Sequence, residues 1–338
     1  MDTKKHYDGI NGLRAFSAIG IVLMHVFANG NYALGGFAFT QVVPSFTNLV
    51  FLFMVISGFA LCCGYYQKTV TRQLDLGAFY GKRFGKIWPF FALLCLMDLV
   101  LSPSLSSLAE VFANLTLMFG LLPNPRLSVI GVGWFLGLVF VFYLLFPFFC
   151  YLLSHRRRAW GAFVIALIFN MLCEYYFEAE RSHFLYSAVY FLAGGLIFLY
   201  KDPLTAFAQK YRWLLLALCI AATACYYILG PSVFVMLALS GLLLVYAMGI
   251  TGKGILNNPV TRFLSDISLE LYLSHMVIYR VLEKLHMLKL FGDGLLSYLF
   301  ASAGVLCGTI LFALAAKWGL KKTGCILQQL KSKKTKGE

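Results

Sequence analysis

The sequence predicts an all-α fold, a polytopic membrane bundle of about ten transmembrane helices with both termini in the cytoplasm. Of the 338 residues, 60% are hydrophobic and only 12% are charged, whereas a soluble domain carries about 25% charged residues. Apolar stretches recur along the chain at roughly the 20-residue length that crosses a bilayer. Basic residues gather in alternate connections between these stretches, which is typical of a multi-pass membrane protein.

Ten apolar windows define the expected spans, with ends that are uncertain by a few residues. They lie near residues 12–29, 48–66, 87–102, 131–153, 159–176, 184–200, 213–229, 232–250, 264–284 and 295–317. The stretch 108–122 is shorter and more polar, so we expect it at the membrane interface or as a re-entrant segment. Without a repeat or linker, residues 1–338 are expected to form one domain, with a helical core over 7–317 and a basic cytoplasmic tail over 318–338.

The net charge of +14 follows from this topology. Twenty-two Lys and Arg residues fall on the side of the two termini and four on the opposite side. This asymmetry places both ends in the cytoplasm and requires an even number of spans. The charge therefore indicates membrane orientation and no nucleic-acid partner. The nine cysteines show no pair with metal-ligand spacing, so neither a metal nor a disulfide is expected.

Arg14 and His25 are the most informative pair, because both lie in the first apolar stretch. Eleven residues at about 100° each return almost to the same direction, so the two side chains share one helix face about 16 Å apart. Ionisable groups within a bilayer tend to face a cavity, a partner or a pathway. Two structural alternatives stay open. Arg14 is also compatible with reaching lipid phosphates, and His25 with a bond to a neighbouring carbonyl.

A basic cluster precedes the third expected span, in the segment YGKRFGKIWP. Lys82 and Lys86 share a helix face and Arg83 lies beside them. Such a cluster suits phosphate groups, with Arg as a planar fork and Lys as a point charge. The alternative is a topology signal, since basic residues flank most cytoplasmic helix ends.

The ninth expected span carries a polar stripe in an otherwise apolar helix: Ser268, Tyr272, His275 and Tyr279. Their spacing of four, seven and eleven residues puts them on one face. In lipid this face should point into the bundle, either toward a cavity or as hydrogen bonds between helices.

Two acids and a Ser-Gly pair complete the candidates. Glu270 lies about 140° from His275 on the helical wheel, so the two are not expected to form a dyad. We expect Glu270 to pair with Arg262 or another basic group. Asp98 fits either a partner for Arg14 or a site carboxylate. Ser57 and Gly58 are compatible with close helix packing or a kink.

Five motifs in order resemble the acyltransferase-3 family of membrane acyltransferases. YDGINGLRAFSAIGIVLMH resembles its first helix, whose signature is an Arg, ten residues and a His, which Arg14 and His25 fit. FLFMVISGF resembles its second helix, KRFGKIWPFF its basic segment, GWFLGLVFVFYLLFP its W-x-L helix, and SDISLELYLSHMVI its late S-Y-x-x-Y-L-x-H helix. The chain departs from the family at Asn11, often Asp, at Lys86, which replaces an Arg, and over 138–141, which lacks the acids that many members carry.

The resemblance implies an O-acetyltransferase type of enzyme. It would move an acyl group, commonly acetyl, from cytoplasmic acyl-CoA to a hydroxyl of a cell-surface or lipid-linked glycan, in the cytoplasmic membrane of a bacterium. His25 would act as base or as acyl carrier, and Arg14 would bind a donor phosphate or stabilise the carbonyl oxygen. Lys82, Arg83 and Lys86 would hold the donor, and Ser57, Ser268, Tyr272 and His275 would line the substrate cavity.

Acyl-CoA is a substrate in this scheme, and no permanently bound cofactor is expected. The main alternative is a transporter or flippase that moves an acyl group or lipid-linked sugar without forming a bond. Paired broken helices, the better sign of a transporter, are not visible in the sequence. A third alternative is a membrane module that presents a partner enzyme.

Overall fold

The computed structural model describes residues 7–101, 103–121 and 131–334 and is 82% helix, with no strand in these ranges. The α-helices are α1 (Gly9–Gly30), α2 (Val43–Ser45), α3 (Leu49–Val70), α4 (Leu76–Leu101), α5 (Leu105–Thr116), α6 (Trp134–Leu153), α7 (Arg156–Tyr175), α8 (Phe184–Leu199), α9 (Lys201–Lys210), α10 (Arg212–Leu229), α11 (Val233–Met248), α12 (Pro259–Asp266), α13 (Ser268–Lys284) and α14 (Leu295–Lys334). A short π-helix, Ala38–Val42, and a 3₁₀ turn, Phe46–Asn48, flank α2. The predicted all-α class is confirmed.

Six helical stretches in the described part are long and apolar enough to cross a bilayer. They are α1, the stretch Ala38–Val70, α6, α7, α10 and the portion Leu295–Lys322 of α14. The pair α8 and α9 would add a seventh, but it bends by 78°. A multi-pass membrane protein is therefore confirmed, whereas the predicted number of ten spans is not.

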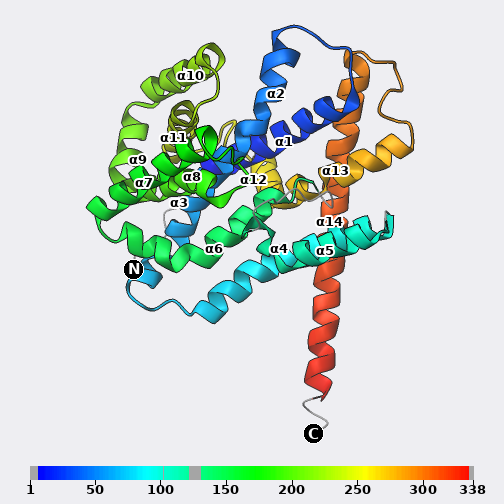
Figure 1. The fold of residues 1–338 in the computed structure, drawn as a ribbon, viewed down its shortest axis with the longest axis horizontal. Coiled ribbons are helices and arrows are strands. Elements are labelled where there is room, and N and C mark those ends of the chain that lie inside the picture. The colour runs from blue at the N-terminus through cyan, green and yellow to red at the C-terminus, as the bar shows by residue number, and fades with distance from the viewer. Residues whose placement is uncertain (1–6, 102, 122–130, 335–338) are drawn as a thin grey trace.

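Breaks and short helices account for part of the difference. The expected span 232–250 is a helix of only 16 residues, and the expected span 264–284 is interrupted at Ile267, between α12 and α13. Apolar windows report composition, and they do not register a bend or a break in the backbone. The last helix, α14, continues past residue 317, where the helical core was expected to end, and projects from the rest of the fold (Figure 1).

The helices α3 and α8 pack closely through two glycines. A Cβ atom on Gly58 would lie 2.3 Å from the carbonyl oxygen of Phe191, and one on Gly194 would lie 2.1 Å from that of Val55. Small residues let membrane helices approach at the backbone, where van der Waals contacts replace the absent hydrophobic driving force. Of the two options for Ser57 and Gly58, the structure shows close packing, and Ser57 is thereby held beside the centre of the bundle.

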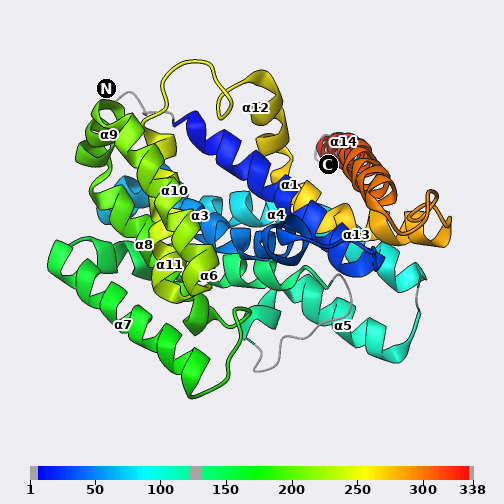
Figure 2. The ribbon, with the colours of Figure 1, turned by 90° about the horizontal axis from the view of Figure 1, so that it is seen from above.

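Helix α1 lies among the helices that carry the candidate residues, in contact with α3, α11, α12, α13 and α14 (Figure 2). Its apolar residues are buried along most of its length, including Ala15, Ala18, Ile21 and Val22. A helix buried on several sides places its few polar groups against neighbouring helices. This position brings Arg14 and His25 against elements from the end of the chain.

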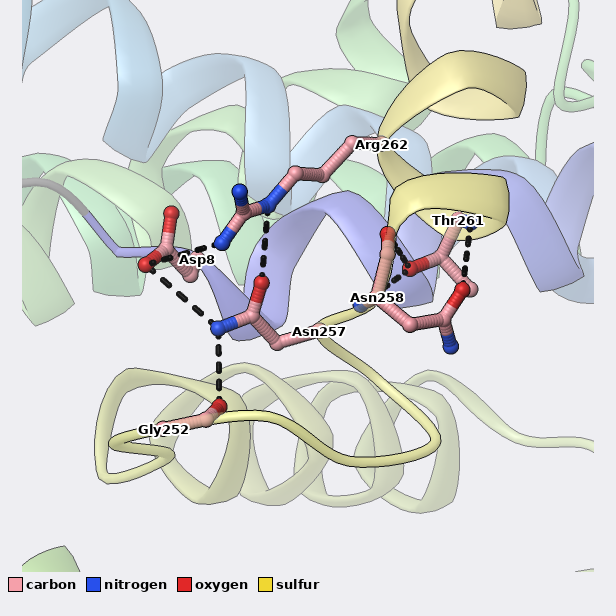
Figure 3. Close-up of polar contacts among 6 residues, drawn as sticks. All are labelled: Asp8, Gly252, Asn257, Asn258, Thr261 and Arg262. Carbon is pink, nitrogen blue, oxygen red and sulfur yellow. Dashed lines mark hydrogen bonds and ion pairs between the residues drawn. The ribbon is translucent and has the colours of Figure 1, made fainter.

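The connection between α11 and α12 fastens the start of α1 (Figure 3). Asp8 forms an ion pair with Arg262 at 3.8 Å and accepts a hydrogen bond from Asn257 at 3.5 Å. Asn257 in turn accepts a 2.9 Å bond from Nε of Arg262. Gly12 lies so close to this connection that a Cβ atom would be 2.4 Å from Cα of Leu256. The backbone that carries Arg14 is therefore fixed from the side of α12.

Helix α12 begins with a capping box, also visible in Figure 3. The side chain of Asn258 accepts from the backbone of Thr261, and the hydroxyl of Thr261 accepts from the backbone of Asn258. These bonds satisfy donors that have no partner within the helix. The cap sets the direction of α12, whose last residues face the candidate site.

Candidate active site

A cavity of about 150 Å³ lies where α1, α3, α4, α6, α12 and α13 meet. Its wall includes seven of the residues that the sequence singled out. These are Arg14, Ser57, Arg83, Lys86, Ser268, Glu270 and Tyr272. Four separate segments of the chain supply them, so their gathering depends on the packing of distant helices.

Arg83 is the best-held cation of this cavity. Its guanidinium carbon lies 4.7 Å from the ring centre of Tyr65 and 5.6 Å from that of Tyr143, which also lines the cavity. Both distances are within the range of cation–π attraction. Its Nε atom is buried and has no hydrogen-bond partner among the described residues. The two rings therefore hold the guanidinium group in the cavity wall.

Lys86 joins Arg83 in the cavity wall, whereas Lys82 does not. Lys82 is exposed on the preceding turn of α4. The four-residue spacing put both lysines on one face of the helix, but the cavity occupies less than two turns of that face. The structure thus separates Lys82 from the expected donor-binding group.

The cavity also contains one buried carboxylate, that of Glu270, whose side chain is 5% exposed. Its partner is Lys317 of α14, at 2.9 Å. Lys317 also donates to the backbone oxygen of Asp266 at 3.0 Å. The predicted pair of Glu270 with a basic group is therefore confirmed, and the group is Lys317. Arg262, the other option, is held by Asp8 at the start of α1. No local sequence pattern predicts Lys317 as the partner of Glu270, since the two residues are 47 positions apart in the chain.

The polar stripe of α13 faces the interior, as its periodicity predicted. Ser268 and Tyr272 line the cavity, and the Tyr272 hydroxyl donates to the carbonyl of Val132 at 2.8 Å. His275 and Tyr279 are also buried, but His275 is outside the cavity wall. The stripe therefore runs from the cavity into the packed bundle.

His25 lies next to His275. The centres of the two imidazole rings are 5.0 Å apart, and the ring of Tyr272 is 6.1 Å from that of His275. His275 is fully buried, and His25 is partly buried. Neither histidine lines the 150 Å³ cavity. The prediction that His25, Ser268, Tyr272 and His275 line one cavity therefore holds for Ser268 and Tyr272 only. Tyr272 connects the cavity to the histidine pair.

Asp98 is paired with Arg280 of α13 at 2.9 Å. The possible partnership of Asp98 with Arg14 is therefore wrong in this structure. Because Asp98 and Arg280 satisfy each other across α4 and α13, they act as a link between these helices. Arg14 remains directed into the cavity with Arg83 and Lys86.

A second cavity of about 570 Å³ lies near the connection between α7 and α8. Arg181 is in its wall, and its guanidinium carbon is 5.3 Å from the ring centre of Trp134, the first residue of α6. His25 is not in the wall of this cavity either. Sequence reasoning did not single out Arg181.

Across residues 7–101, 103–121 and 131–334, no three His, Cys, Asp or Glu side chains gather in a way that would hold a metal ion. The chemistry that this site offers is that of an imidazole pair and a cluster of cations.

A family model described as "Acyltransferase domain" matches residues 7–314 of the chain. The match spans all five motifs noted in the sequence and includes every residue of the cavity. Comparisons with curated proteins and with solved structures give no match.

Proposed function

The chain belongs to the acyltransferase-3 family of membrane acyltransferases, and we propose that it moves an acyl group, in the first place acetyl, from cytoplasmic acyl-CoA to a hydroxyl of a cell-surface or lipid-linked glycan. The observation that carries this proposal is the gathering of Arg14, Arg83 and Lys86 in the wall of one cavity. Arg14 lies on the face of α1 that also bears His25.

The cations suit the phosphate groups of acyl-CoA. Arginine binds phosphate through two parallel hydrogen bonds, and lysine adds a point charge. Of the two roles open to Arg14, phosphate binding is the one that its neighbours favour, because Arg83 and Lys86 line the same wall. Arg14 is three helical turns from His25, about 16 Å along the axis. The long pantetheine arm of the donor would cover this distance past Tyr272.

His25 would supply the chemistry at the far end of this arm. As a general base, its imidazole takes the proton of the acceptor hydroxyl while the oxygen attacks the thioester carbonyl. The new C–O bond forms, the C–S bond breaks, and the CoA thiolate leaves and takes up the proton. An acyl group carried on His25 is the alternative route to the same ester.

The acceptor would approach from the side opposite the donor. The 570 Å³ cavity with Arg181 is the candidate entry, because its wall also holds Asn48, Tyr190 and three glutamates, groups that form hydrogen bonds with hydroxyls. In this proposal the enzyme lies in the bacterial cytoplasmic membrane, with both termini in the cytoplasm and its product directed outward.

The test is transfer of radiolabel from acetyl-CoA to a glycan fraction by the purified protein in nanodiscs. His25→Ala should lower the rate by about 10²–10⁴-fold, the usual contribution of a general base. His155→Ala is the matched control, since His155 is an exposed residue at the start of α7 and its loss should leave the rate unchanged.

Full activity of a well-folded His25→Ala protein would refute the mechanism. Movement of labelled substrate across the membrane without ester formation would instead support the transporter alternative.

A further inference from the structure

The tautomer of His275 is fixed by the backbone of its own helix. Its Nδ1 lies 2.7 Å from the carbonyl oxygen of Tyr272 and 3.3 Å from that of Leu271. A carbonyl oxygen only accepts, so Nδ1 must carry the proton. A neutral imidazole has one donor and one acceptor nitrogen, and Nε2 of His275 is therefore an acceptor.

This acceptor has no partner of its own. Nε2 of His275 is buried and makes no hydrogen bond within the described part of the chain. Buried polar atoms are nearly always satisfied, and one that is not calls for an explanation. The ring of His25 lies 5.0 Å away, tilted by 42°. Two imidazole rings at this centre-to-centre distance can bring one nitrogen of each within hydrogen-bond reach, because the second torsion angle of a histidine side chain is soft enough to turn a nitrogen toward the acceptor.

We propose that His275 is the positioning residue for His25: its Nε2 accepts a hydrogen bond from a ring N–H of His25 and so fixes the tautomer of the catalytic base. The other ring nitrogen of His25 then keeps its lone pair for the acceptor hydroxyl. When His25 takes up the proton, the bond to His275 becomes charge-assisted and stronger. The inference rests on the proposed function for its catalytic consequence, but not for the hydrogen bond itself.

A neighbouring residue provides a control for packing. Tyr279 lies one turn beyond His275 on the same stripe, and its hydroxyl is likewise buried and without a partner among the described residues. Tyr279→Phe removes a polar group from the same helix face without touching His25. A general disturbance of α13 should affect both positions, whereas positioning of the base should depend on His275 alone.

The kinetic experiment compares His275→Phe and His275→Gln. Phenylalanine keeps a ring but has no acceptor, and we expect kcat to fall about 10–100-fold, as when a second-layer partner of a functional histidine is lost. KM for acetyl-CoA should stay constant. Glutamine offers an amide oxygen as acceptor and should recover much of kcat. Equal losses in both variants, or the same loss in Tyr279→Phe, would overturn the proposal.

A spectroscopic measurement on the unmutated protein does not depend on activity. Solid-state NMR of protein labelled with ¹⁵N-histidine reports which ring nitrogens are protonated, with the His25 signals assigned through His25→Ala. We expect a single neutral tautomer of His25 that becomes mixed in His275→Phe. A mixed tautomer in the unmutated protein would refute the hydrogen bond. A fixed tautomer without any acyl transfer would refute the proposed function and leave the histidine pair standing.

Discussion

Arg83 and Lys82 are adjacent basic residues of α4 with different surroundings, and their comparison tests where the donor binds. Arg83 lines the cavity and is held between Tyr65 and Tyr143, whereas Lys82 is exposed and outside it. A hydrogen bond to a charged group contributes about 1.5–3 kcal/mol. Arg83→Ala should therefore weaken acetyl-CoA binding about 10- to 150-fold. Lys82 would act on a bound phosphate only through water. At a separation of about 10 Å its charge contributes roughly 0.4 kcal/mol to binding, which is about a twofold change in affinity.

The assay is scintillation-proximity binding of labelled acetyl-CoA to purified protein in nanodiscs at several salt concentrations. Salt should erase the small effect of Lys82→Ala and only reduce that of Arg83→Ala, since partly buried charges are screened less. Arg83→Lys keeps the charge but loses the planar fork, so its affinity should fall between the two. Melting curves of each variant exclude misfolding. If Lys82→Ala weakened binding as much as Arg83→Ala, the cluster would be a topology signal and not a donor site.

Two further predictions concern the packing that supports the site. Gly194→Ala places a Cβ atom 2.1 Å from the carbonyl oxygen of Val55, so α3 and α8 must separate, and we expect a loss of about 1–3 kcal/mol in unfolding experiments in detergent. Gly241→Ala, whose Cβ atom would meet nothing closer than 3.9 Å, is the control, and equal stability of the two variants would contradict the packing. Tyr272→Phe leaves the buried carbonyl of Val132 without its donor. Tyr272→Phe should lower the free energy of unfolding by about 1–3 kcal/mol in the same detergent experiment. An unchanged unfolding midpoint would contradict the predicted contribution of this hydrogen bond.

The sequence determined the class of the molecule and the relations within each helix. Low charge content and recurring apolar stretches suffice for an all-helical membrane protein, because a bilayer accepts few other solutions for the backbone. Helical periodicity placed Arg14 and His25 on one face, and put Ser268, Tyr272 and His275 on another that turns inward. These statements depend only on the rotation of about 100° per residue, which neighbouring helices hardly change.

The tertiary structure decided which groups meet. It brought His25 to His275, gave Glu270 the distant Lys317 as its partner, and left Lys82 outside the cavity. Within the described residues it shows six helical stretches long and apolar enough to cross a bilayer, where ten were expected, and a bend of 78° between α8 and α9. Composition and spacing could not show these results, because contacts between helices depend on the angles and offsets at which they pack. Those are set by close backbone approaches such as the one at Gly194, and no periodic pattern within a single helix encodes them.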